Sequence, residues 1–114
     1  MAIKRVWNAF LYSISGLKDA IKTQTAFRIE LALGLVLFPL ALILGQNGIE
    51  RTFLIGSLMI VLIVELINSS IEAAIDRISL ERHELSRKSK DLASAAVFLS
   101  LVNVPIVWLL ILFQ

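Results

Sequence analysis

The segment FLIGSLMIVLIVELINSSIEAAIDR, residues 53–77, joins a long apolar run to a regular series of polar side chains. Residues 52–71, which begin one residue before this segment, number 20, and at about 1.5 Å per helical residue they are long enough to cross a hydrocarbon core of about 30 Å. Glu65 lies inside that run, where an acidic side chain costs about 2.5–3.5 kcal/mol even on the lenient insertion scale. We therefore expect a transmembrane helix at about 51–75 whose carboxylate faces the interior of a helix bundle.

The polar side chains of this helix share one face. Glu65, Asn68, Glu72 and Asp76 follow one another at i, i+3, i+7 and i+11. At about 100° per residue they fall within a stripe about 80° wide. The sequence thus predicts a ridge of three acids and one amide, here called the acidic ridge, on an otherwise apolar helix.

Two further apolar runs predict two more spans. Residues 31–44 carry no charge, but they reach only about 21 Å, so the first span must begin earlier, at about 26–45. The turn cluster at 45–48 ends it. Residues 92–113 are also uncharged and predict a third span at about 91–113.

The N-terminal segment predicts a helix on the membrane surface. Residues 3–22 place apolar side chains at spacings of three and four, with basic and polar side chains on the other side and Trp7 near the start. A soluble helix that packs against a core is the alternative.

Composition excludes several classes of protein. The 114 residues are 58% hydrophobic, more than a small water-soluble domain can bury. There is no cysteine and one histidine, which excludes disulfides, thiol chemistry and a multi-histidine metal cluster. A net charge of +2 does not indicate nucleic-acid binding. We expect an all-α membrane protein with residues 1–114 as a single membrane domain.

The basic residues predict the orientation. They gather before the first span and between the second and third, while the other loop offers only Arg51. By the positive-inside rule, the N-terminus is expected to be cytoplasmic, and three spans then leave the C-terminus outside.

The acidic ridge has three interpretations. It could be polar glue between helices, a proton or cation pathway in a small coupled transporter that uses Glu65, or a metal–phosphate site. Glu65 and Glu72 are about 10 Å apart along the axis, too far for one ion but suitable for a base and a metal ligand. The basic residues that follow, which could hold a polyphosphate or serve only as a topology signal, are Arg82, His83, Arg87, Lys88 and Lys90. No glycine-rich phosphate loop is present.

Three motifs resemble the prokaryotic diacylglycerol kinase family. VELINSSIEAAIDR (64–77) carries the pattern E-x-x-N-S-x-I-E-x-x-x-D, and HELSRKSKDLASAAV (83–97) carries K-D-x-x-S-A-A. Upstream, residues 26–30 match A-F-R-x-E. The resemblance implies an ATP-dependent lipid kinase of the bacterial cytoplasmic (inner) membrane. Such a kinase transfers the γ-phosphate of MgATP to diacylglycerol to give phosphatidate, and it works as a homotrimer with sites shared between subunits. Undecaprenol kinase, the sister branch, is the alternative.

The resemblance also implies roles for residues. Glu65 is the expected general base, and Asn68 helps to orient the hydroxyl. Mg²⁺ is expected on Glu72 and Gln24, although the family usually carries glutamate at the position of Gln24, which puts the affinity for metal in doubt. The residues expected to contact ATP are Arg5, Tyr12, Gln24, Glu72, Glu81, Arg82, His83, Lys90 and Asp91. Those expected to contact the lipid are Ser13, Arg28, Glu30, Arg51, Glu65 and Ser94.

Overall fold

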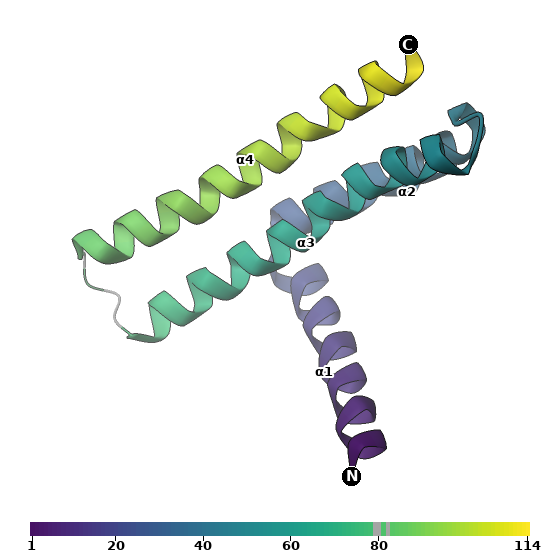
Figure 1. Cartoon of the computed structure of the whole chain (residues 1–114). Coiled ribbons are helices and arrows are strands. Elements are labelled where there is room, and N and C mark those ends of the chain that lie inside the picture. Colours follow the sequence, from purple (N-terminus) through teal and green to yellow (C-terminus); the bar gives the residue numbers. More distant parts are fainter. Residues whose placement is uncertain (79–80, 82) are drawn as a thin grey trace.

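The computed structural model describes residues 1–78, 81 and 83–114, and the part of the chain that it describes is helical without strands. Its four helices are α1 (Ala2–Thr23), α2 (Thr25–Leu44), α3 (Gly48–Ile78) and α4 (Glu84–Leu112) (Figure 1). The last three are long and apolar enough to cross a membrane. The expected all-α fold, one amphipathic helix followed by three spans, is confirmed.

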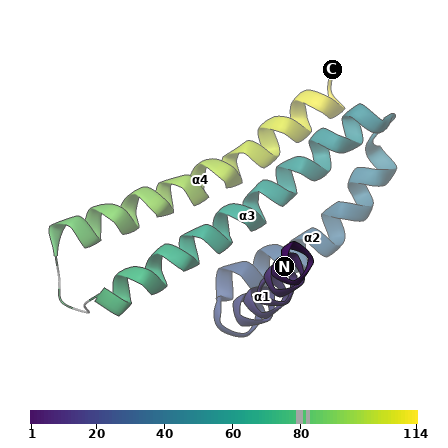
Figure 2. The same ribbon diagram turned by 60° about the horizontal axis from the view of Figure 1, so that its bottom comes forward.

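Helix α3 is the centre of the bundle. It packs against α4 on one side and α2 on the other, and Figure 2 shows it lying between them. Hydrogen bonds also join α3 to the C-terminal part of the chain, away from the acidic ridge. Trp108 Nε1, on α4, donates to Ser57 Oγ over 3.1 Å and to the carbonyl of Leu54 over 3.3 Å. Gln114 Nε2, just beyond α4, donates to Glu50 Oε2 over 2.8 Å. The helix that carries the acidic ridge is thus held by neighbours on both sides.

Helix α1 runs away from the bundle, as Figure 1 shows. Its buried residue is Ala20, near the end that meets α2, whereas Trp7 and Phe10 stack on each other with ring centroids 5.7 Å apart and remain exposed. An exposed apolar stripe on a basic helix is typical of a helix that lies in the membrane interface.

The α1–α2 junction is fixed by an arginine. Gln24 is extended between the two helices, with φ −106° and ψ 104°. The guanidinium of Arg28 donates to the carbonyls of Ile21 and Lys22, which have no partner within α1 because they lie in its last turn. This cap sets where α1 leaves the bundle.

Helices α3 and α4 extend further than the sequence predicted. They have 31 and 29 residues, about 46 Å and 44 Å, against a hydrocarbon core of about 30 Å. Helix α4 begins at Glu84 rather than at about residue 91. The charged segment is helical because Arg87 pairs with Glu84 and with Asp91, at i,i+3 and i,i+4, and because His83 Nδ1 accepts from the amide of Leu85.

Candidate functional site

The acidic ridge runs down α3 from the inside of the bundle to its exposed end. Glu65 is 5% exposed, so the expectation that its carboxylate faces the protein interior is confirmed. Asn68 Nδ2 donates to Glu72 Oε1 over 3.4 Å, and Glu72 is exposed. The Oδ1 atom of Asn68 is buried without a hydrogen-bond partner among the described residues. An unsatisfied buried carbonyl oxygen next to a carboxylate is a ready ligand for a cation or a donor.

A second carboxylate approaches the ridge from α2. The Oε2 atom of Glu30 is buried, with no hydrogen-bond partner in the part of the chain that the structure describes. Glu30 also stands at an otherwise apolar cavity of about 170 Å³ between α2, α3 and α4, whose wall includes Gly34, Val61 and Pro105. The structure therefore brings Glu30 to the wall of a cavity that α3 lines with Val61 and Leu62, within one helical turn of Glu65.

A hollow of about 640 Å³ lies between α1 and α3, beside the ridge. The α1 side and the junction contribute Ser13, Gly16 and Gln24, and α3 contributes Ser69 and Ala73. Ser69 directly follows Asn68, and Ala73 directly follows Glu72. Both therefore lie on the strip of α3 surface next to the ridge. Small side chains on both helices leave room for this hollow. Their helical spacing along α1 and α3 is a signal that the sequence analysis did not use.

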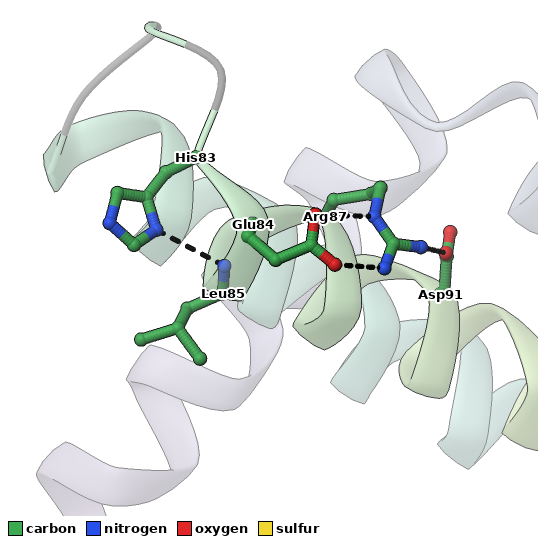
Figure 3. A network of polar contacts seen from close by, with 5 residues as sticks. All are labelled: His83, Glu84, Leu85, Arg87 and Asp91. Carbon is green, nitrogen blue, oxygen red and sulfur yellow. Dashed lines mark hydrogen bonds and ion pairs between the residues drawn. The ribbon is translucent and has the colours of Figure 1, made fainter.

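Charged residues gather where α3 ends and α4 begins. Lys90 Nζ lies 2.9 Å from Asp76 Oδ1, which joins α4 to the end of the acidic ridge. Arg87 holds Asp91 at 2.7 Å and also pairs with Glu84, as Figure 3 shows. His83 caps α4 through its Nδ1 atom, which accepts from Leu85 N at 3.1 Å. The structure thus places Lys90 and Asp91 near the exposed end of the ridge.

Other expected site residues lie elsewhere in the chain. Arg5 and Tyr12 line a separate hollow near the start of α1, and Arg5 is about 28 Å along that helix from Gln24. The guanidinium of Arg28 donates to backbone carbonyls at the α1–α2 junction. Ser94 and Glu81 are exposed. Arg82, predicted to contact ATP, lies outside the described residues.

Arg51 is at the opposite end of α3 from the exposed acids, about 21 Å along the helix from Glu65. Its Nε atom donates to the carbonyl of Leu42 over 3.1 Å and so closes the end of α2. Within the single chain, this arginine is part of the α2–α3 turn rather than of the acidic ridge.

The oxygen atoms of the ridge fit a magnesium ion that is shared with phosphate. Within residues 1–78, 81 and 83–114, no three His, Cys, Asp or Glu side chains converge as a metal cage. Glu72 and the unsatisfied Oδ1 of Asn68 nevertheless offer two neighbouring oxygens. Mg²⁺ is commonly held by one or two carboxylates plus substrate phosphates, so a partial set of protein ligands is what it requires.

The chain is similar to one known family over most of its length. The profile described as prokaryotic diacylglycerol kinase matches residues 11–112. The diacylglycerol kinase of Haemophilus influenzae is 49% identical over 106 residues, which cover 93% of this chain and 90% of that protein. The diacylglycerol kinase of Pseudomonas aeruginosa is 44% identical over 110 residues, 96% of this chain and 89% of that protein. The diacylglycerol kinase of Helicobacter pylori strain 26695 is 41% identical over 105 residues, 92% and 82% respectively.

Proposed function

The chain belongs to the prokaryotic diacylglycerol kinase family, and we propose that it transfers the γ-phosphate of MgATP to the primary hydroxyl of diacylglycerol, giving phosphatidate. The observation that supports this reaction best is the acidic ridge of α3, which has a buried carboxylate at one end and, at the other, exposed acids joined to a lysine. Phosphoryl transfer requires mainly positioning and neutralisation of charge. A ridge of this kind can meet a lipid within the membrane and a nucleotide from water.

Glu65 is the proposed general base. Its carboxylate takes the proton of the lipid hydroxyl, the hydroxyl oxygen attacks the γ-phosphorus, and ADP leaves with the bridging oxygen. Burial of Glu65 among α3 and its neighbours keeps water away from this carboxylate. Asn68, one turn further along, orients the hydroxyl or the phosphate.

Glu72 would hold Mg²⁺ together with the phosphates, and Gln24, which lines the hollow between α1 and α3, is the proposed second ligand. The ion would supply neutralisation of the charge that develops on the transferred group. An amide at Gln24 offers an oxygen ligand without charge, which predicts weaker binding of the metal than a carboxylate would give.

The nucleotide would be bound by residues from two regions. Lys90 and Asp91 lie near the start of α4, close to the exposed acids, and Glu81 and His83 precede that helix. Arg82, also proposed to contact ATP, lies outside the described residues. Arg5 and Tyr12 are at the far end of α1. Because about 28 Å of helix separates Arg5 from Gln24, we expect these groups to meet between subunits of a homotrimer.

The lipid would reach Glu65 from the side, within the bilayer. The apolar cavity that Glu30 borders supports an approach between the helices. Ser13 and Ser94 are proposed to contact the lipid headgroup. Arg28 and Arg51 are proposed lipid contacts as well, and each donates to a backbone carbonyl at one end of α2. We propose one membrane domain in the bacterial cytoplasmic membrane, with the N-terminus cytoplasmic and the C-terminus outside, as the distribution of basic residues supports.

Transfer of labelled phosphate from ATP in mixed micelles tests the proposal. Diacylglycerol and undecaprenol are offered in parallel with Mg²⁺, and the products are separated by chromatography. We expect labelled phosphatidate from the wild type and none above background from Glu65→Gln. Labelling of undecaprenol instead would assign the chain to the sister branch. A folded, oligomeric sample that labels neither lipid would overturn the kinase proposal and would favour a transporter that uses Glu65.

A further inference from the structure

One ion pair connects the acidic ridge to the helix that carries the proposed nucleotide contacts. Asp76 lies in the last turn of α3, and Lys90 lies in the second turn of α4. Lys90 Nζ and Asp76 Oδ1 are 2.9 Å apart. Among the described residues, this is the ion pair that joins two helices, since those of Arg87 lie within α4.

The pair is poorly placed to stabilise the fold. The side chain of Lys90 is 43% exposed and that of Asp76 is 49% exposed. Ion pairs this open to water contribute little to the free energy of unfolding, because solvent screens the charges and because ordering two side chains costs entropy. Other hydrogen bonds also hold α3 to the C-terminal part of the chain: Trp108 donates to Ser57, and Gln114 donates to Glu50. The main consequence of the ion pair is therefore the position in which it holds the ammonium group of Lys90.

That place is the exposed end of the acidic ridge. Asp76 follows Glu72 by four residues, about 6 Å along α3, on the same face of the helix. A phosphate that shares a metal ion with Glu72 is consequently close to the ammonium of Lys90. An ammonium group has three N–H donors, so one can remain on Asp76 while the others meet phosphate oxygens.

We infer that Asp76 is a positioning residue for phosphoryl transfer, which holds Lys90 Nζ at the end of the acidic ridge so that the ammonium meets the phosphates of the nucleotide. The inference rests on the proposed function, because it requires Lys90 to contact ATP. The physical gain is preorganisation. A lysine side chain has four rotatable bonds and loses considerable entropy when it is fixed, and the carboxylate fixes it before the nucleotide arrives. Protein kinases hold their phosphate-binding lysine with a glutamate for a similar purpose, which is an analogy of chemistry and not of fold.

Asp76→Asn tests the inference, because it removes the charge that holds Lys90 and keeps the size of the side chain. We expect the KM for ATP to rise roughly tenfold, the order of one lost charge-assisted contact, with little change in the KM for lipid. The thermal midpoint of unfolding in micelles should stay within error of the wild type. Asp76→Glu, which keeps the charge, should restore most of the affinity. The matched control is Glu50→Gln, which alters an α3–α4 contact of 2.8 Å at the other end of α3 and should leave the KM for ATP unchanged.

A double-mutant cycle with Lys90→Gln separates positioning from other roles. In the Lys90→Gln background, Asp76→Asn should add no further rise in the KM for ATP, because no ammonium is left to position. Equal effects in both backgrounds, or an unchanged KM in the single variant, would overturn the inference. If Asp76→Asn does not fold, Asp76→Glu alone decides, since positioning predicts a KM between the wild type and Lys90→Gln.

Equilibrium binding of ATP with Mg²⁺ to the same variants keeps this result distinct from the proposed function. If the wild type labels no lipid, the kinase proposal fails. In that case, coupling between Asp76 and Lys90 in ATP binding would still show that Asp76 positions the lysine. If the wild type labels diacylglycerol and the cycle shows no coupling, the inference alone fails.

Discussion

At the scale of single residues, Glu65 is the side chain whose environment differs most from that of an ordinary acid. It is almost fully buried on a membrane-spanning helix, and Glu72 lies two turns further along the same face. A bundle that needed only polar glue would be served by one amide or hydroxyl, since two neighbouring carboxylates repel each other. The position of Glu65 is therefore explained better by chemistry than by packing.

Replacement of Glu65 by Gln should lower kcat by about 10²–10⁴-fold, the usual contribution of a general base, with small changes in the KM for ATP. Gln keeps the volume and the hydrogen-bonding capacity, so the oligomer should remain intact. Steady-state kinetics in mixed micelles, next to a size-exclusion profile, measure both. A variant that retains more than a tenth of wild-type kcat would remove Glu65 from the role of base.

Gln24→Glu should lower the Mg²⁺ concentration needed for half-maximal activity. Gln24 borders the hollow between α1 and α3, where an added charge can attract the ion. A titration of activity against Mg²⁺ at fixed ATP measures the effect. Gly16→Ala, a change on the α1 side of the same hollow where nothing lies within 4 Å of the added atom, serves as the control and should not shift the titration. An unchanged midpoint in Gln24→Glu would contradict a ligand role.

At the scale of elements, the sequence determined the helices well and their ends less well. The apolar runs place α2, α3 and α4, because a membrane requires about 20 apolar residues whatever they pack against. The start of α4 is different. The stretch from Glu84 to Asp91 is polar, and its helical state depends on side chains that find partners one turn away and on the cap from His83. Composition alone does not reveal such local pairing.

The α2–α3 turn gives a prediction at this scale. A Cβ atom on Gly45 would stand 2.5 Å from Arg51 Cγ and 3.0 Å from the carbonyl oxygen of Ala41. Gly45→Ala must therefore displace the arginine that closes the end of α2, and we expect a loss of about 1–3 kcal/mol in the free energy of unfolding. Unfolding in micelles measures it. Gly48→Ala is the matched control, since nothing lies within 4 Å of the added atom, and equal losses in both variants would refute the explanation.

At the scale of the whole molecule, the chain divides its expected site residues between distant places. Glu30 and Gln24 border cavities that α3 also lines, and Lys90 is joined to the end of the acidic ridge. Arg5, in contrast, lies far along α1, which runs away from the bundle (Figure 1). The proposed function therefore predicts that a complete site takes residues from a second copy of the chain.

Mixed oligomers of two inactive variants should recover part of the activity if sites are shared. Arg5→Ala and Glu65→Gln are each expected to be nearly inactive alone. When they are co-assembled, some sites would combine a normal Arg5 from one chain with a normal Glu65 from another. Phosphate transfer should then rise well above that of either variant, and crosslinking in mild micelles should capture trimers. Mixtures that stay inactive, or samples that crosslink only as monomers, would contradict shared sites.

The sequence by itself determined the class of the protein, its three spans, its surface helix and the ridge Glu65–Asn68–Glu72–Asp76, because hydropathy and helical period are properties of neighbouring residues. Only the tertiary structure decided that Glu30 borders a cavity together with Val61 of α3, that Lys90 pairs with Asp76 and that a hollow lies between α1 and α3. These contacts join separate helices. They depend on how the helices pack and where the chain turns, which the periodicity of a single helix does not encode.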